Sequence, residues 1–284
     1  MKVNFTTIEN YPAPLKLGIF IFCLLLLWLP LAIPLYLLLK NDPNLTTIVT
    51  MGVLYLEFVG LLFIWNKNVY NISHWWRVYG LVFTRKNGIE LINGLSIGLL
   101  FTLSLFIVES MFGWVKFSQP SNSLILVIFQ GLLSALGIGL AEELFFRGWL
   151  LTELKRDYSP KIALFANAIT FATLHFLKPI EEVIRTFPQF PALVLLGLTL
   201  IWSKWGHGNR LGICIGLHGG LVWGYYILNV GKLINYTEIV PSWITGIDNN
   251  PIAGVMGLLF LVILGLLMKR KSSSIYYKTD PSDF

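Results

Sequence analysis

The sequence predicts an all-α fold, a polytopic membrane helical bundle of about eight transmembrane helices, on two compositional observations and one pattern. Hydrophobic residues make up 55% of the 284 residues and charged residues only 13%. The mean hydropathy is +0.69. A soluble domain has about 25% charged residues, so this chain lacks the polar surface of a soluble fold. The apolar residues also form runs of the length that crosses a bilayer, about 20 residues each.

Eight apolar runs are the candidate membrane helices. They cover residues 15–39, 46–65, 91–113, 123–153, 160–177, 190–204, 211–230 and 251–268. The first run is longer than a signal-peptide core, and no small-residue cleavage site follows it, so we expect a retained helix. Pro30 and Pro34 favour a kink within it, which membrane helices tolerate. Ser159 and Pro160 are typical of the N-cap and first turn of the fifth helix.

The lysines and arginines predict the orientation. If the N-terminus is cytoplasmic, the inside segments carry 15 of the 21 cations, the outside segments carry five, and Arg147 lies within a span. By the positive-inside rule both termini are cytoplasmic. We therefore interpret the net charge of +6 as membrane topology and not as nucleic-acid binding. We expect an integral multi-pass protein of a bacterial plasma membrane, and Cys23 and Cys214 are expected to be small hydrophobic residues of the spans.

Three ionisable residues lie close together inside the fourth apolar run. They are Glu142, Glu143 and Arg147, and they follow a long apolar stretch. Charged groups inside a membrane span are energetically costly, so their presence points to a function. At about 100° per residue, the two glutamates face different directions. Glu143 and Arg147 are four residues apart and are expected to pair. Glu142 is left without a local cationic partner, which suits a carboxylate that takes up and releases protons.

Two histidines lie in later spans. His175 shares a helix face with Phe171, and His218 is followed by two glycines that allow close helix packing. At 1.5 Å per residue from the loop between their helices, Glu142 and His175 are expected at similar depth. His74 and His207 are expected at the membrane interface and outside the site.

These residues resemble the motifs of the CPBP family, the CAAX-protease and bacteriocin-processing membrane proteins also called the Abi family. The EExxxR motif is present as Glu142, Glu143 and Arg147, and the FxxxH motif as Phe171 and His175. The third motif, HxxxN or HxxxD, is half present, because Val222 stands four residues after His218. The resemblance covers about residues 123–230 and implies a helical intramembrane endopeptidase.

The resemblance also implies the role of each residue. Glu142 and His175 would activate a water molecule, His218 would help to bind the oxyanion, and Glu143 with Arg147 would brace the site beside Phe171. A divalent metal such as zinc, held by Glu142, His175 and His218, is the alternative to direct activation of water by Glu142. No HExxH pair argues for the metal.

Val222 leaves the oxyanion pocket one donor short of the family pattern. His218 and backbone N–H groups suffice, or Asn167 or Asn229 supplies the missing group, or activity is reduced. The loss of one such donor costs about 10²–10³ in rate. A weakly active or inactive CPBP-like scaffold or immunity protein is therefore an alternative. A proton-coupled transporter is a further one, although no inverted repeat supports it.

The expected organisation has three parts. Residues 1–120 hold unassigned N-terminal transmembrane helices, residues 121–232 form the CPBP-like catalytic core, and residues 233–284 contain the last transmembrane helix and a polar, loose tail. The expected partners are the lipid bilayer and a membrane-embedded or membrane-anchored peptide or protein substrate.

Overall fold

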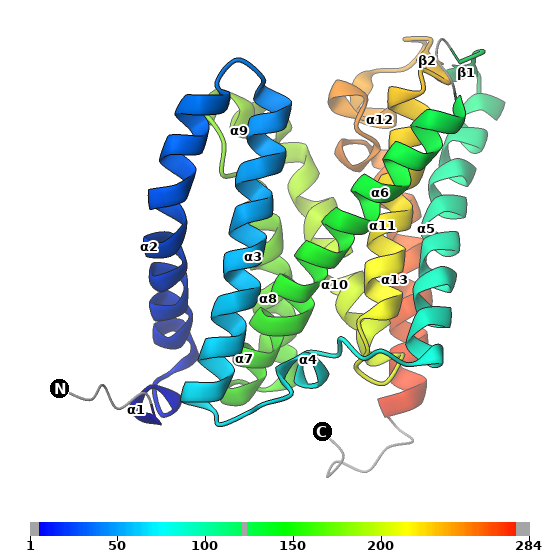
Figure 1. Cartoon of the computed structure of the whole chain (residues 1–284). Helices are drawn as coiled ribbons and strands as arrows, with labels where there is room; N and C mark the ends of the chain where they lie inside the picture. The colour runs from blue at the N-terminus through cyan, green and yellow to red at the C-terminus, as the bar shows by residue number, and fades with distance from the viewer. Residues whose placement is uncertain (1–5, 121–123, 277–284) are drawn as a thin grey trace. The chain divides into compact units, whose positions relative to one another are not determined.

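The computed structural model describes residues 6–120 and 124–276, and they are almost entirely helical (Figure 1). The first part of the chain forms α1 (Thr6–Glu9), α2 (Ala13–Leu39), α3 (Pro43–Val69), α4 (Trp75–Val78), α5 (Arg85–Met111) and the strand β1 (Val115–Phe117). The middle part forms α6 (Leu124–Glu143), the π-helix η1 (Leu144–Leu150), α7 (Leu151–Asp157), α8 (Pro160–Leu174), α9 (Ile180–Thr186), η2 (Phe187–Gln189), α10 (Phe190–Trp205) and α11 (Gly212–Val230). The last part forms β2 (Ile234–Tyr236), α12 (Ser242–Thr245), η3 (Ile247–Asn249), η4 (Pro251–Ala253) and α13 (Val255–Tyr276).

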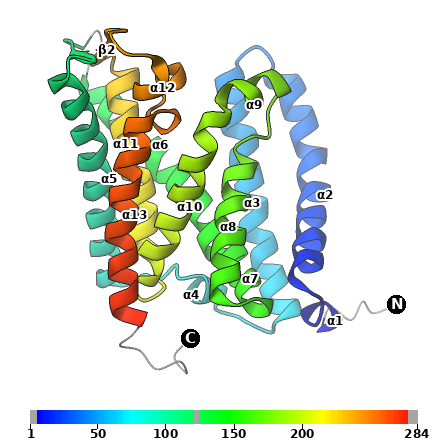
Figure 2. The ribbon, with the colours of Figure 1, turned by 180° about the vertical axis from the view of Figure 1, so that it is seen from behind.

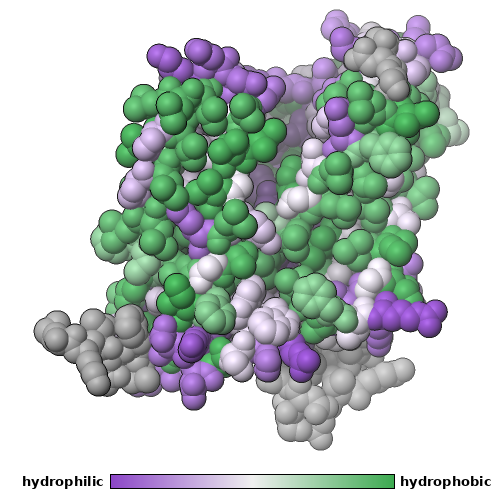
Figure 3. All heavy atoms as spheres, viewed as in Figure 1, coloured by the Kyte–Doolittle hydropathy of each residue, from purple (hydrophilic) through white to green (hydrophobic). Residues whose placement is uncertain are grey.

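The predicted helical membrane bundle is confirmed, and each of the eight apolar runs corresponds to a helix. Within residues 6–120 and 124–276, six helical segments are long and apolar enough to cross a membrane: Ala13–Leu39, Pro43–Val69, Arg85–Met111, Leu124–Asp157, Ile180–Trp205 and Gly212–Val230. The other two predicted runs correspond to α8, which has 15 residues, and to α13. Hydrophobic side chains cover the flanks of the helices and hydrophilic ones gather at their ends (Figure 3).

The chain divides into two compact units. The first comprises residues 1–78 and 153–157, and the second comprises residues 79–152 and 158–284. In the first unit α2 and α3 pack against each other through Phe20, whose ring meets the edges of Phe58 and Trp65. Helix α2 continues through Pro30 and Pro34 as a single helix.

An ionic network ties the helices of the first unit together. Lys16 of α2 is 2% exposed and its Nζ lies 3.3 Å from Asp157 Oδ1. The hydroxyl of Tyr70, just after α3, donates to the buried carboxylate of Glu153. Arg156 lies 3.6 Å from that carboxylate and stacks 3.7 Å above the Tyr70 ring. Burial and the Glu153 charge raise the pKa of Tyr70, so the phenol stays protonated and keeps donating.

In the second unit, α11 packs against α5, α6 and α10 (Figures 1 and 2). The glycines of α11 allow this close packing, as expected from the two glycines that follow His218. A Cβ at Gly220 would lie 2.3 Å from the Leu95 carbonyl oxygen of α5. A Cβ at Gly219 would lie 3.1 Å from the Ala135 carbonyl oxygen of α6. Helix α11 is therefore held between two neighbours at close range, and His218 is held with it.

Two features differ from the sequence-based expectation. Strands β1 and β2 pair antiparallel with Val115 opposite Tyr236, joining the loop after α5 to the loop after α11. The expected loose tail after Lys269 begins as helix, because α13 continues to Tyr276. The rest of that tail lies outside the described residues.

Candidate active site

The EExxxR motif lies where one long helix changes its winding. Helix α6 is α-helical to Glu143, the next seven residues are π-helical, and α7 continues from Leu151. The uniform α-helix assumed from the sequence is therefore wrong over residues 144–150. π-helical segments are rare and occur often at functional sites.

Glu143 and Arg147 form the predicted pair, and the structure adds His218 to it. Arg147 Nη1 donates to Glu143 Oε1 over 2.8 Å, and neither side chain is exposed. The same Oε1 lies 2.8 Å from His218 Nδ1. Because a carboxylate only accepts hydrogen bonds, the proton lies on Nδ1 of His218. Glu143 thus fixes the orientation of the His218 ring, which spacing along the sequence does not reveal.

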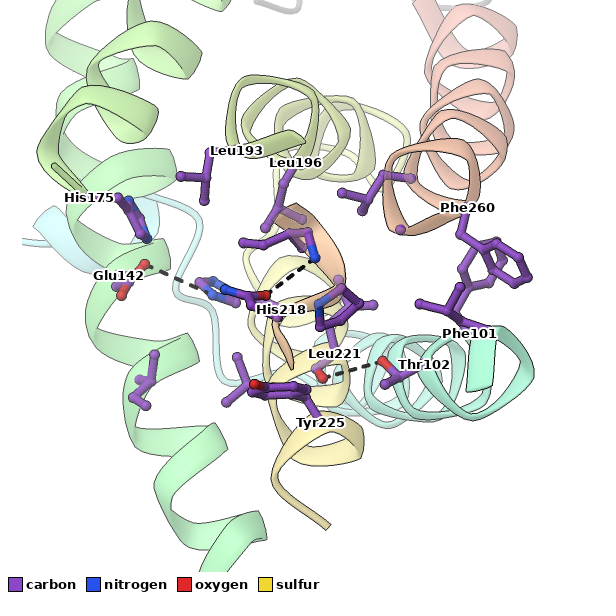
Figure 4. A pocket seen from close by; sticks show the side chains of 18 of the residues that line it. Phe101, Thr102, Glu142, His175, Leu193, Leu196, His218, Leu221, Tyr225 and Phe260 are labelled. Atoms are coloured by element: carbon purple, nitrogen blue, oxygen red, sulfur yellow. Dashed lines mark hydrogen bonds and ion pairs between the residues drawn. The ribbon is translucent and has the colours of Figure 1, made fainter. Parts of the chain in front are cut away.

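Glu142 is not part of the Glu143–Arg147 ion pair and approaches the other ring nitrogen of His218. Its side chain is 32% exposed, and its Oε2 lies 3.9 Å from His218 Nε2 (Figure 4). That oxygen is nevertheless buried and has no hydrogen-bond partner within the described residues. A buried carboxylate oxygen without a donor is costly, and a bound donor such as water or substrate would relieve that cost.

His175 caps the C-terminal end of α8, and Phe171 packs against it. Its Nδ1 lies 2.7 Å from the Phe171 carbonyl oxygen, so Nδ1 donates and Nε2 keeps a free lone pair. The Phe171 ring lies 4.5 Å from the His175 ring and 6.3 Å from the His218 ring. The Arg147 guanidinium stacks over the same ring at 4.3 Å. The Phe171 ring thus lies beside both imidazoles and the Arg147 guanidinium.

One pocket of about 290 Å³ brings the three predicted residues together. Glu142, His175 and His218 line it from α6, α8 and α11. In Figure 4 Glu142 and His175 lie on one side of the pocket, and Phe101 and Phe260 lie on the opposite side. Most of the remaining lining is apolar: Leu105, Ile138, Leu193, Leu196, Leu221, Val222, Pro251, Ile252 and Leu261. The pocket thus combines a polar wall with a large apolar surface.

Side chains from α8 and α10 hold the π-helical segment in place. Asn167 Nδ2 donates to the Phe146 carbonyl oxygen over 2.7 Å. Lys204 Nζ donates to the Arg147 carbonyl oxygen over 2.6 Å, and this lysine is only 4% exposed. Lys204 lies at the end of an apolar run, where a cation is expected at the polar end of its helix, and the sequence gives no sign of this buried, supporting position.

Asn250 is a pocket residue that the motifs do not contain. It lies just before η4 and lines the pocket together with Val222. Its Oδ1 accepts from the Ile252 N–H over 3.3 Å. The other two asparagines considered above have partners elsewhere, since Asn167 bonds to Phe146 and Asn229 donates to the Tyr225 hydroxyl. Asn250 is thus the asparagine that shares the pocket with the candidate residues.

A zinc site at Glu142, His175 and His218 needs all three donor atoms about 2.0–2.2 Å from one ion. The chemistry of the donors suits zinc, because each histidine bonds through Nδ1 to an oxygen and leaves Nε2 for a ligand. Within residues 6–120 and 124–276, however, no group of three His, Cys, Asp or Glu side chains is arranged to hold a metal. Glu142, His175 and His218 therefore do not stand in the geometry of a metal site.

Comparison with known proteins agrees with the motifs. Residues 120–224 match the family model described as Rce1-like, type II CAAX prenyl endopeptidase. This match confirms the resemblance to the CPBP/CAAX-protease family and supports, at the level of that family, a membrane-bound peptidase. No curated protein and no solved structure matches the chain.

Proposed function

We propose that this protein, with its Rce1-like segment at residues 120–224, is an intramembrane endopeptidase in which Glu142 and His175 activate water. One observation carries the proposal. A buried Glu142 oxygen that has no hydrogen-bond partner among the described residues borders a pocket that two histidines also line. In this geometry a water molecule could donate hydrogen bonds to the Glu142 carboxylate and to an imidazole nitrogen. The apolar surface of the pocket would contact the substrate.

The proposed reaction is a general-base hydrolysis. Glu142 takes a proton from water while the water oxygen attacks the carbonyl carbon of the scissile peptide bond. The Nε2 lone pair of His175 orients the same water, because its Nδ1 proton is held by the Phe171 carbonyl oxygen. The tetrahedral intermediate then collapses, the C–N bond breaks, and protonated Glu142 returns its proton to the leaving nitrogen.

His218 has a conditional role in binding the oxyanion. Its Nδ1 proton is committed to Glu143, so an N–H at Nε2 exists only in the imidazolium form. The carboxylates of Glu142 and Glu143 lie on its two sides. The imidazolium would then donate to the developing oxyanion, where fixed donors contribute most.

Glu143 and Arg147 are proposed to support the site without touching the substrate, whereas Phe171 lines the pocket and packs against the His175 ring. Glu143 is shared between Arg147 and His218, so it balances one cation and aligns the other. We take residues 121–232 as the catalytic core. Phe101 of α5 and Phe260 of α13 complete the pocket wall from outside that range.

The apolar side of the pocket suits a membrane-associated peptide or protein. A prenylated C-terminal peptide is one candidate, because the matched family model is named for CAAX prenyl endopeptidases. A transmembrane peptide without a lipid is the other. We propose cleavage at the plasma membrane of a bacterium, with both termini cytoplasmic.

Purified protein in nanodiscs should cleave at least one member of a panel of farnesylated and unmodified membrane peptides. Products formed in H₂¹⁸O should carry ¹⁸O in the new carboxylate, and Glu142→Ala should abolish their formation. Val222 in the pocket wall favours one alternative, a protein that keeps the fold and has lost turnover. Wild-type protein that binds these peptides and cleaves none would support that alternative.

A further inference from the structure

A second hollow, of about 870 Å³, lies at the opposite end of α5 from the strand β1. It is lined by the first turns of α5, by the loop between α10 and α11 and by the end of α13: Arg85, Lys86, Ile89, Glu90, Asn93, Gly206, His207, Gly208, Arg210 and Lys271. In Figure 1, α5 begins and α13 ends at the same end of their unit. None of these residues lines the candidate active site.

Positive charge dominates this basic hollow. Arg85, Lys86, Arg210 and Lys271 are cationic, and Glu90 is the one carboxylate among the lining residues. Glu90 is committed to Arg210, whose Nε donates to its Oε2 over 2.8 Å. Arg85 and Lys86 are exposed and take part in no ion pair with the described residues. The hollow therefore keeps a positive field that the protein itself does not neutralise.

His207 and Lys271 show how the cations are oriented. The His207 Nδ1 lies 2.7 Å from the Ser203 carbonyl oxygen and must donate to it. Its Nε2 is then an acceptor, and Lys271 Nζ donates to it over 2.6 Å. Burial lowers the pKa of His207, and the charge of Lys271 lowers it further, which keeps the ring neutral and able to accept. Lys271 is thereby held at the wall of the hollow by a fixed partner.

The start of α5 adds to the same field. Arg85 and Lys86 occupy the first turn of a 27-residue helix, whose N-cap is Thr84. Backbone N–H groups and the positive end of the helix dipole favour an anion at such a position. The positive-inside rule explains the number of cations at this end. It does not explain why side chains from three separated segments meet around one hollow.

Apolar surface continues from the hollow along α5. Ile89 lines the hollow and is 47% exposed, and Ile92 on the next turn is 62% exposed. An anion with attached acyl chains would match both the basic hollow and the apolar surface, with its phosphate among the cations and its chains along these isoleucines. A free phosphate would occupy only the basic hollow.

We propose that this basic hollow binds the anionic phosphate headgroup of a membrane phospholipid. Arg85, Lys86 and Lys271 contact the phosphate, and the acyl chains lie along the exposed face of α5. Basic hollows between membrane helices on the cytoplasmic side are suited to such headgroups. The site is separate from the proposed active site and does not depend on its chemistry.

Titration of the full-length protein in neutral detergent tests the proposal. The probes are dihexanoyl-phosphatidylglycerol, dihexanoyl-phosphatidylcholine and inorganic phosphate, with heat of binding as the readout. Phosphatidylglycerol should bind at least tenfold more tightly than either of the others. At about fivefold per charge, Arg85→Gln with Lys86→Gln should weaken that binding about 25-fold.

A matched control removes two cations outside the hollow, Lys161→Gln with Lys178→Gln, and should change the affinity less than twofold. Equal weakening in the control would overturn the proposal, because a general field would then be responsible. Equal affinity for phosphatidylcholine would overturn it too, and equal affinity for inorganic phosphate would replace the lipid with a free anion.

Lysine acylation of the unaltered protein removes any dependence on how the variants fold. In nanodiscs that contain phosphatidylglycerol, Lys86 and Lys271 should react more slowly than in pure phosphatidylcholine, and Lys161 should react equally in both. No protection of Lys86 in the anionic nanodiscs would contradict the proposal.

Discussion

We predict that Asn250, a pocket side chain outside the motifs, supplies the hydrogen-bond donor that Val222 lacks. Its Oδ1 caps η4 by accepting from Ile252, which leaves the Nδ2 protons of the amide for the pocket. We predict that Asn250→Asp, which keeps the capping oxygen and removes the N–H donor, lowers kcat about 10²–10³-fold. The melting temperature should change little. Steady-state kinetics and thermal unfolding in detergent check both.

Two further variants distinguish a hydrogen-bond donor role of Asn250 from a purely structural role. Val222→Asn should restore part of the lost rate in the Asn250→Asp background, since position 222 lines the same pocket. Asn250→Ser, a good cap without an amide, should resemble Asn250→Asp. An Asn250→Asp variant with wild-type kcat would show that the amide does not touch the oxyanion.

The buried pair of Glu143 and Arg147 should matter more for stability than Glu142 does. Removal of either partner leaves a buried charge without its counterion, which typically costs about 3–5 kcal/mol. We predict that Glu143→Ala and Arg147→Ala each lower the free energy of unfolding by this order, and that a double-mutant cycle shows strong coupling. Additive effects of the two substitutions would contradict the hydrogen bond between them.

At the scale of elements, local pattern was enough to predict the helices and the relation between the glutamates. Ser159 caps α8 and Pro160 opens it, as their residue types indicate. The i, i+4 spacing of Glu143 and Arg147 was also informative, because even with a π-helical turn beginning after Glu143 the two side chains still meet. The change from α-helix to π-helix after Glu143 was not predictable, because an apolar run has no hydrophobic periodicity in which such a change would appear.

Contacts between distant segments were not predictable in this way. His218 meets Glu143 from 75 positions away, and Lys204 reaches the carbonyl of Arg147 from 57 positions away. A cation near the end of an apolar run has the same local pattern whether it faces water or a buried carbonyl oxygen. Asn250 lies in an irregular segment between β2 and α13, where hydrophobic periodicity carries no information.

The approach of α11 to α5 gives a prediction at this scale. A Cβ at Gly220 would lie 2.3 Å from a backbone oxygen of α5, which cannot move without shifting the helix. We predict that Gly220→Ala lowers the free energy of unfolding by about 1–3 kcal/mol and also reduces cleavage by displacing His218. Gly137→Ala is the control, because its Cβ would meet nothing within 4 Å. Equal stability of the two variants would contradict close packing at Gly220.

At the scale of the whole molecule, the composition was sufficient to predict a membrane bundle, and the cations predict its orientation. Inside-facing segments hold 15 of the 21 lysines and arginines if both termini are cytoplasmic. We predict that a cysteine introduced at Ser273, with Cys23 and Cys214 replaced by alanine, resists membrane-impermeant maleimide in intact cells. It should react after permeabilisation, and labelling in intact cells would contradict the predicted orientation.

Glu142 is proposed to activate the water that hydrolyses a membrane-associated peptide. The most direct measurement compares Glu142→Gln with Glu109→Gln, each in nanodiscs with one cleaved peptide. Both glutamates lie in apolar helices and have carboxylate oxygens without hydrogen-bond partners in residues 6–120 and 124–276, but of the two only Glu142 lines the pocket. We predict that Glu142→Gln loses cleavage at least 10²-fold with an unchanged melting temperature, within the range for general-base catalysis, while Glu109→Gln keeps its rate. Wild-type turnover by folded Glu142→Gln would contradict it.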